Sequence, residues 1–228
     1  MRGRKKVRSF WILSFLTLLF WDASAAAGKW VTVTRVADGD TVELWGGRRV
    51  RYIGVNAPEI NHELNTAEPF GFEARASNAT LVDSRKIRLE LDVERYDAYG
   101  RTLAYVFLTD QTLVNEKLLQ EGLAYFLYKM PNVKYADRLL KAQREAMQAR
   151  RGIWKDGREK IEGRFIGNRN SRRLHLADCP EVKRVYPRNR VVFATRWDAF
   201  WDGYSPSKEC LPAFGTATLS PSPWPPPR

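Results

Sequence analysis

The chain has 228 residues, 44% of them hydrophobic, and a formal net charge of +12. This length supports one sizeable core and a small second module, and it excludes two full-sized domains. The basic balance favours an anionic partner such as nucleic acid or an anionic membrane, without deciding between them.

The first segment has the layout of a secretory signal peptide. Basic residues at the start precede an apolar run over residues 10–21, and small residues follow at 23–27. An uncleaved membrane anchor is the alternative, but the apolar run is shorter than the roughly 20 residues that a spanning helix needs. Residues 1–27 are therefore predicted to be a signal peptide. The protein is expected to be exported to the periplasm or the extracellular space, without a membrane contact after cleavage.

From residue 30 the pattern is typical of β-strands. β-Branched and aromatic residues alternate roughly over 30–36 and 41–45, and residues 48–55 continue the pattern. Gly46 and Gly47 between the last two segments are a hairpin turn signal. Three adjacent strands are predicted.

A helix and two further strands are predicted next. The helix covers residues 70–84, and the strands cover 86–94 and 101–108. Strict alternation predicts that the first of these strands is half-buried through Ile87, Leu89, Leu91 and Val93.

Two helices end this part of the chain. The first covers residues 113–121 and stops at Gly122, and the second covers 133–150. One face of the second helix gathers Ala136, Leu139, Leu140, Gln143, Ala146 and Met147. The order of elements predicts a mainly β fold with α-helices (α+β), a five-stranded OB-fold barrel with three helices over residues 28–157.

The composition then changes. Residues 163–212 contain both cysteines and are predicted to form a small C-terminal α/β module. Residues 213–228 are rich in Pro, Ser and Thr, so they are expected to form a disordered tail, because they cannot bury enough apolar surface.

Asp38, Asp40 and Glu59 form an acidic group beside arginines in this basic chain. A Ca²⁺ ion would explain the combination, because carboxylate and carbonyl oxygens bind hard cations. A bound cation reverses the local sign of charge and, with the arginines, attracts a phosphodiester.

Three segments of this region, "DGDTV", "RYIGVNAPE" and "DAYGRTLAYVF", resemble the staphylococcal nuclease-like (thermonuclease) family. "VNEKLLQEGLA" and "RRGIW" extend the resemblance over about residues 30–155. The resemblance implies a hydrolase on an OB-fold, an endonuclease that cleaves DNA and RNA phosphodiesters with Ca²⁺ and little sequence specificity. The products would carry 3′-phosphate and 5′-hydroxyl ends.

The resemblance also implies roles for individual residues. The metal would be held by the Asp40 carboxylate, by Asn56 and by the main-chain carbonyl of Ala57. The catalytic residues would be Glu59, which activates or orients water, and Arg51 and Arg101, which contact the scissile phosphate. The residues in contact with nucleotides would be Tyr99 and Tyr128.

The chemistry of the reaction agrees with these roles. Phosphodiester hydrolysis builds negative charge on oxygen, and a metal with two fixed guanidinium groups stabilises that charge. A carboxylate within hydrogen-bond reach of water can take its proton. Aromatic rings stack on any base, which suits cleavage without sequence specificity.

Asn56 departs from the aspartate that the family often has at this position. An amide oxygen still binds Ca²⁺ but brings no charge, so weaker metal binding is expected. Asp38 is interpreted as a turn former rather than a ligand, and His62 as a solvated side chain rather than a base.

The alternative function is a noncatalytic module that binds nucleic acid or protein on the same fold. Such modules tend to lose the arginines and the glutamate, whereas Arg51, Glu59 and Arg101 are all present. The expected partners are therefore DNA and RNA, without a stable protein partner, and the protein is expected to be a monomer.

The cysteine-containing segment resembles the small metal-binding unit of Ada-type DNA-repair proteins. His175 and Cys179 keep the spacing of its first ligand pair, whereas Ser207 and Cys210 replace the second. Three interpretations stay open: a Cys179–Cys210 disulfide, as exported proteins favour, a three-ligand metal site, or free thiols.

Two further features of this segment have alternative interpretations. Trp197, Phe200 and Trp201 form either the core of the module or a stacking platform for bases. The basic run at 168–173 either contacts phosphates or forms a solvated face.

Overall fold

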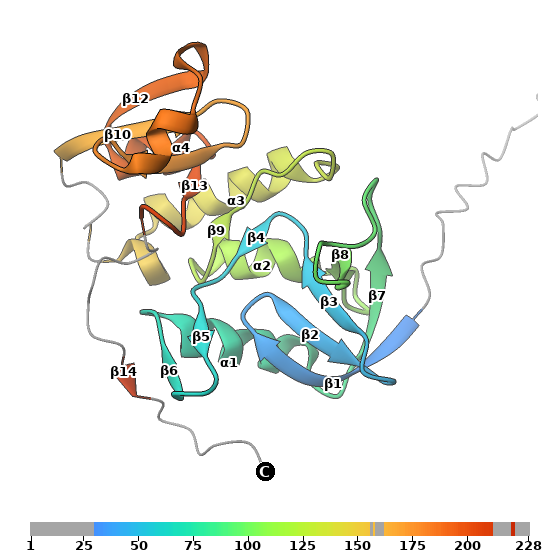
Figure 1. Ribbon diagram of the computed structural model, residues 1–228. Coiled ribbons are helices and arrows are strands. Elements are labelled where there is room, and N and C mark those ends of the chain that lie inside the picture. The colour runs from blue at the N-terminus through green and yellow to red at the C-terminus, as the bar shows by residue number, and fades with distance from the viewer. Residues whose placement is uncertain (1–29, 156, 158–161, 212–219, 222–228) are drawn as a thin grey trace, which may run out of the picture.

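The computed structural model describes residues 30–155, 157, 162–211 and 220–221 (Figure 1). The predicted signal peptide lies outside the described residues, as does all of the predicted tail except residues 220–221. Within the described part, no helix combines the length and the apolar character needed to cross a membrane.

Five strands close into a barrel in the order β1-β2-β3-β8-β7. Their bounds are β1 Trp30–Asp38, β2 Thr41–Leu44, β3 Arg49–Tyr52, β7 Lys86–Glu90 and β8 Thr102–Phe107. Strands β3 and β8 run parallel, and the other pairs run antiparallel. Gly46 and Gly47 adopt positive φ in the turn between β2 and β3, as the turn signal predicted. The predicted five-stranded barrel is confirmed.

Three helices pack against the barrel. They are α1 Gly71–Val82, α2 Val114–Gln120 and α3 Ala136–Gln148. The predicted face of α3 is confirmed, because Leu139, Gln143, Ala146 and Met147 are buried and the other two members are partly buried. Gly122, with φ +69°, follows the last residues of α2, in agreement with the predicted stop.

Strand β7 is shorter than the predicted strand over residues 86–94. It ends at Glu90, and Leu91 and Val93 are 40% and 70% exposed instead of buried. The Asp92 carboxylate accepts hydrogen bonds from the Tyr105 hydroxyl at 3.1 Å and from the Lys134 amide at 3.0 Å. These hydrogen bonds hold the segment near the start of α3. The alternating sequence pattern therefore continues beyond Glu90, whereas the hydrogen-bonded strand ends there.

Short strands carry the segments between β3 and α1. Strand β4, Val55–Asn56, pairs with β9, Tyr125–Phe126. Strand β6, Thr66–Ala67, pairs with β5, Ile60–Asn61, and with β14, Ser220–Pro221. The ladder with β9 fixes the backbone of Asn56 beside the barrel.

The C-terminal module is a four-stranded sheet with the order β12-β10-β11-β13 and one short helix. After the 3₁₀ helix η1, Gly152–Trp154, its elements are the strands β10 Glu162–Asn168, β11 Arg173–Leu176, β12 Arg190–Thr195 and β13 Ser205–Pro206, the α-helix α4 Arg196–Trp201, and the 3₁₀ helices η3 Pro180–Arg184 and η4 Pro187–Asn189. The predicted small α/β module is confirmed.

The module shares a hydrophobic core with the barrel helices. Phe200 of α4 is 1% exposed and lies 5.6 Å, between ring centroids, from Trp154 of η1. The Gln143 amide of α3 donates to the carbonyl of Phe200 at 2.7 Å, and its oxygen accepts from the Phe126 amide at 2.6 Å. Figure 1 shows α3 between the module and the barrel, so this helix fixes how the module sits beside the cleft described below.

Candidate functional site

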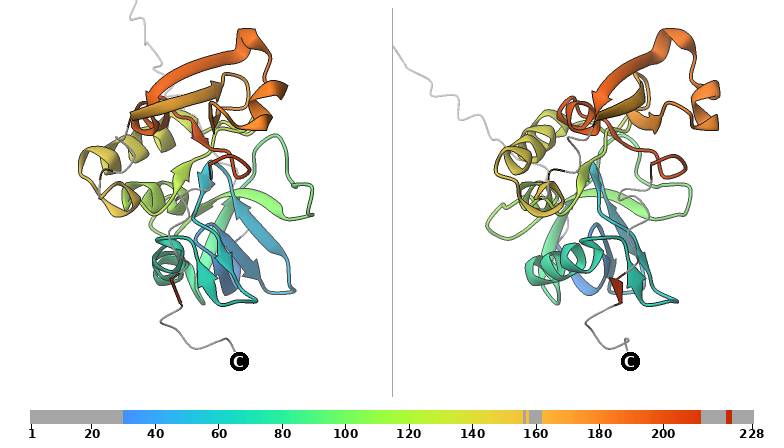
Figure 2. Two further views of the ribbon diagram at one scale, coloured as in Figure 1. Left: turned by 60° about the vertical axis from the view of Figure 1, so that its left-hand side comes forward. Right: turned by 90° about the vertical axis from the view of Figure 1, so that its left-hand side faces the viewer.

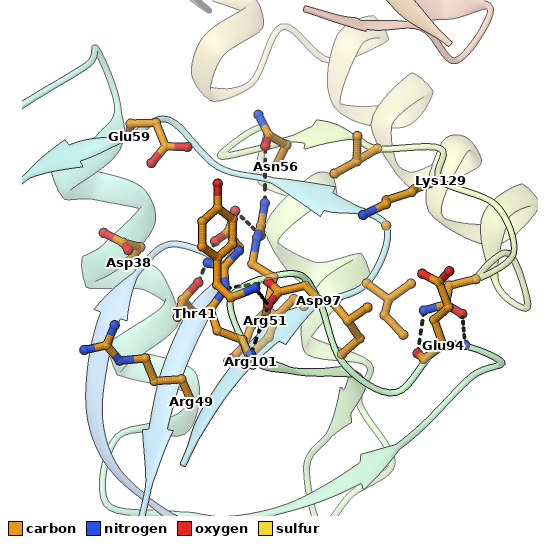
Figure 3. Close-up of a pocket in the computed structure, with 18 of the residues that line it drawn as sticks. Asp38, Thr41, Arg49, Arg51, Asn56, Glu59, Glu94, Asp97, Arg101 and Lys129 are labelled. Carbon is orange, nitrogen blue, oxygen red and sulfur yellow. Dashed lines mark hydrogen bonds and ion pairs between the residues drawn. The ribbon is translucent and has the colours of Figure 1, made fainter. Parts of the chain in front are cut away.

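One cleft of about 540 Å³ collects most of the residues expected to act together (Figure 3). Its walls come from β1 to β4, from the loops over 94–101 and 127–132, and from the C-terminal module. The expected site residues that line it are Asp40, Arg51, Asn56, Glu59, Tyr99 and Arg101. Tyr128 does not line this cleft, and Ala57 reaches it through a backbone contact with Asp40.

Asp40 follows the turn that ends β1 and is only 6% exposed. Its Oδ2 accepts a hydrogen bond from the Ala57 amide at 2.7 Å, and its Oδ1 accepts one from the Thr41 hydroxyl at 3.1 Å. Gly39 permits this close packing, because a Cβ there would lie 2.6 Å from the Cβ of Ala74 and 2.7 Å from that of Ala57. The turn therefore presses the carboxylate against the segment that carries the other expected ligands.

Arg51 connects two of the expected metal ligands. Its guanidinium forms an ion pair with Asp40, and Nη2 donates to Oδ1 of Asn56 at 3.2 Å. The alternation of β3 points Arg51 into the cleft between these partners (Figure 3).

The oxygens present fit a hard divalent cation such as Ca²⁺. Asp40 and Asn56 already converge on a positively charged group, the guanidinium of Arg51. Carboxylate, amide and main-chain carbonyl oxygens are the ligands that Ca²⁺ prefers. The set contains a single negative charge, so water would have to complete the usual six to eight ligands.

The three acidic residues that first indicated a metal do not gather around one point. Among the described residues, the only group of three or more His, Cys, Asp or Glu side chains with converging ligand atoms is in the C-terminal module. Asp38 instead contacts His62, with Oδ1 2.9 Å from Nε2. Burial, together with the nearby charge of Asp40, raises the pKa of the Asp38 carboxyl. The interpretations of Asp38 as a turn former rather than a ligand, and of His62 as a solvated side chain rather than a base, remain predictions.

Glu59 lies between β4 and β5, at one side of the cleft in Figure 3, with Arg51 and Arg101 nearer the middle. Its side chain is 52% exposed and forms an ion pair with Lys208 of the C-terminal module. Its backbone amide donates to the carboxylate of Glu68 at 2.9 Å, which fixes the main chain there. The carboxylate therefore lines the cleft and remains accessible to solvent.

Arg101 is held by Asp97 at the start of β8. Its Nε donates to Oδ2 at 2.7 Å, and the amides of Arg101 and Tyr99 both donate to Oδ1 at 2.9 Å. Burial raises the pKa of Asp97, but these hydrogen bonds outweigh burial and lower it overall. Asp97 thus stays ionised and fixes the direction of the guanidinium.

The two expected aromatic contacts have different environments. Tyr99 is 85% exposed, with the Arg101 guanidinium carbon 5.5 Å from its ring centroid. Tyr128 packs partly against the barrel core, and Arg172 of the C-terminal module lies 5.9 Å from its ring centroid. Tyr99 is therefore accessible to a base at the rim of the cleft.

Two lining residues come from the C-terminal module, Arg173 and Lys208, and only Arg173 had a signal in the sequence. Arg173 belongs to the basic run at 168–173, which the sequence indicated only as one of two alternatives. Lys208 is a single lysine in a loop and carries no sequence signal. The packing of the module against α3 is what brings both into the cleft.

Cys179 and Cys210 form a disulfide, with Cα atoms 5.7 Å apart. This selects one of the three interpretations left open by the sequence. Nδ1 of His175 lies 3.2 Å from Sγ of Cys210, and burial lowers the pKa of this imidazole. The Ser207 hydroxyl donates to Glu209 at 2.7 Å. Phe200 is a core residue of the module, with Trp197 and Trp201 packed against the same cluster.

Residues 49–156 match the protein family described as staphylococcal nuclease homologue. A thermonuclease of Staphylococcus hyicus is 40% identical over 125 residues, which cover 54% of this chain and 73% of that protein. The thermonuclease of Staphylococcus intermedius is 40% identical over 130 residues, covering 56% and 77%. Endonuclease YncB of Bacillus subtilis is 41% identical over 129 residues, covering 54% of this chain and 61% of that protein. The chain therefore belongs to the staphylococcal nuclease family.

This membership confirms the first resemblance, the OB-fold and the predicted enzyme class, a nuclease that hydrolyses phosphodiesters. The comparisons do not confirm the second resemblance, to the Ada-type metal-binding unit. The family match ends at residue 156, before the module that begins with β10.

Proposed function

We propose that the protein is an exported, Ca²⁺-dependent endonuclease that hydrolyses DNA and RNA with little sequence specificity. The observation that carries this proposal is the gathering of Arg51, Glu59 and Arg101 in one cleft with the oxygens of Asp40 and Asn56. A noncatalytic binding module would need the cations but not a carboxylate at the position of Glu59. The names of the relatives, thermonuclease and endonuclease, support the same activity.

Three side chains take part in the proposed cleavage step. Glu59 takes a proton from the attacking water, whose oxygen forms the new bond to phosphorus. Arg51 and Arg101 contact the phosphate oxygens, where negative charge develops. The bond from phosphorus to the 5′ oxygen breaks, and this oxygen takes a proton from solvent. The products have 3′-phosphate and 5′-hydroxyl ends.

All three groups have other partners in the free protein, and that of Glu59 is Lys208. Arg51 can exchange the oxygens of Asp40 and Asn56 for those of the phosphate, and Asp97 keeps Arg101 directed into the cleft. A divalent cation held by Asp40, Asn56 and the Ala57 carbonyl would supply positive charge beside the phosphate. Tyr99 offers a ring to a neighbouring base.

Export and a monomeric state are part of the proposal. The signal-like pattern of residues 1–27 supports export, and the disulfide supports it further, because disulfides persist in oxidising compartments. A basic surface without a stable protein partner suits an enzyme that meets extracellular or periplasmic nucleic acid.

The direct experiment is digestion of plasmid DNA and of a structured RNA by the purified protein, with Ca²⁺ or with chelator. Cleavage in Ca²⁺ but not in chelator, with 3′-phosphate ends on the products, would support the proposal. Binding of both nucleic acids without any cleavage would instead favour the noncatalytic module.

A further inference from the structure

We propose that the C-terminal module completes the nuclease cleft, and that Lys208 and Arg173 form a phosphate-binding subsite for the nucleic-acid strand beside the scissile phosphate. The class of ligand rests on the proposed function. The subsite itself rests on contacts between parts of the chain that are far apart in sequence.

Lys208 reaches across the cleft from the module to the barrel. It lines the cleft and forms an ion pair with Glu59, which lies 149 residues earlier in the chain. Its side chain is 59% exposed. An ammonium group has three donors, so the contact with one carboxylate oxygen leaves donors for an incoming phosphate. A polyanion that enters the cleft would exchange with Glu59 as the partner of Lys208.

Arg173 lines the same cleft from the first residue of β11. Its Nη1 donates to the Ser205 hydroxyl at 3.2 Å and to the Pro206 carbonyl at 3.0 Å, so these bonds orient the guanidinium without neutralising it. Burial lowers the pKa of Arg173, and the like charge of Arg51 lowers it further, against the opposing charge of Glu209. Two guanidinium groups that repel each other in one cleft are stabilised when a polyanionic strand binds there.

The loop that carries Lys208 is anchored at both ends. Strand β13 pairs in parallel with β11, which places Ser205 opposite Arg173. The Ser207 amide donates to the Leu174 carbonyl at 2.9 Å, and the Cys179–Cys210 disulfide fixes the far end. Both views of Figure 2 show the red segment after β13 between the module and the barrel. Fixing the cations in advance reduces the ordering cost when a strand binds.

The subsite gives the module beyond the family barrel a role in binding the substrate. In the proposed reaction, Arg51 and Arg101, which pair with Asp40 and Asp97 in the free protein, contact the scissile phosphate. Lys208 and Arg173 approach the cleft from the C-terminal module. A nucleic-acid strand that contacts both the barrel and the module is held in register with the water beside Glu59.

The test measures binding of a fluorescein-labelled oligothymidylate by the full chain in chelator, where no cleavage is expected, across a range of NaCl concentrations. Lys208→Gln and Arg173→Gln are each expected to weaken binding. Each should also reduce the slope of log K against log salt by about 0.7, the value for one phosphate contact on a single strand. Lys183→Gln removes an exposed charge of the same module that does not line the cleft, and it should leave the slope unchanged.

Three further measurements separate loss of a phosphate contact from loss of structure. Arg173→Lys keeps the charge and should retain the slope, and thermal melting identifies any variant that unfolds. Lys208 is exposed, so its replacement should not disturb the fold. If the Arg173 variants prove unstable, the binding of Lys208→Gln alone tests the subsite. In the presence of Ca²⁺, both Gln variants should raise KM more than they lower kcat.

The proposal is overturned if Lys208→Gln binds the oligonucleotide with the affinity and salt slope of the wild type. Tighter binding or faster cleavage by this variant would also overturn it, because Lys208 would then act only as an internal partner of Glu59. Failure of the wild-type protein to cleave under any metal condition, with the slope changes intact, would refute the proposed catalysis and leave the subsite standing.

Discussion

Arg51 donates a hydrogen bond of 3.2 Å to the amide oxygen of Asn56, an oxygen expected to bind the metal. The same guanidinium is ion-paired with Asp40. In the proposed site, Arg51 and the metal would compete for the same two oxygens, and the charge on residue 56 would influence both.

Asn56→Asp adds a negative charge to the ligand set, so the Ca²⁺ concentration for half-maximal activity should fall. Maximal turnover should fall as well, because the added carboxylate holds Arg51 more tightly. A Ca²⁺ titration of cleavage measures both effects. Asn170→Asp adds the same charge at an exposed position outside the cleft and is the matched control. An unchanged Ca²⁺ midpoint for Asn56→Asp would mean that residue 56 does not bind the metal.

Asp97→Asn should lower kcat by about tenfold to a hundredfold, because Arg101 loses the ion pair that directs it toward the phosphate. Asp110→Asn is the control, since Asp110 accepts a similar backbone hydrogen bond, from Thr112 at 2.9 Å, in an exposed turn. Steady-state kinetics of both variants separates the two cases. Wild-type kcat in Asp97→Asn would show that Arg101 needs no such partner.

Gly39→Ala should destabilise the barrel by about 1–3 kcal/mol and raise the Ca²⁺ midpoint. The new Cβ would meet Ala74 and Ala57, so the turn that presents Asp40 must move. Urea unfolding and a Ca²⁺ titration measure the two effects. The double variant Gly39→Ala with Ala74→Gly removes one of the clashes and should recover part of the midpoint. If Gly39→Ala matches the wild type in both measurements, the turn has room that the contact distances exclude.

Replacement of both Cys179 and Cys210 by serine should weaken oligonucleotide binding by the same factor as Lys208→Gln, because the loop of Lys208 loses its anchor. The module should also lose about 3–4 kcal/mol of stability. Reductant added to the wild type should reproduce the binding defect, whereas the serine variant should not respond to reductant. A wild-type affinity in the reduced protein would show that β13 alone positions the loop.

The barrel could be predicted from the sequence because its signals are local. Alternation defined the strands, Gly46 and Gly47 marked a turn, and the spacing of apolar residues marked the buried face of α3. The same alternation rule predicted too long a strand β7. Leu91 and Val93 continue the alternation, but Asp92 between them bonds to the backbone amide of Lys134 just before α3.

The site could be predicted only in part. Motifs in one segment of the chain identified Asp40, Arg51 and Glu59, and the structure places all three in the cleft. The bridge from Arg51 to both ligand oxygens depends on how β3 and β4 approach each other. Lys208 reaches Glu59 through the docking of the module, and no pattern of residues encodes that contact locally.

The rate of single-turnover cleavage at saturating Ca²⁺ by Glu59→Gln is the most direct measure of whether this cleft is catalytic. The amide keeps the shape of the side chain but cannot take a proton from water, so the rate should fall by about 10²-fold or more, with unchanged circular dichroism. Glu63→Gln, in the exposed loop that follows, should cleave like the wild type. Wild-type cleavage by folded Glu59→Gln would contradict the assignment of Glu59 as the base and, with it, the proposed mechanism.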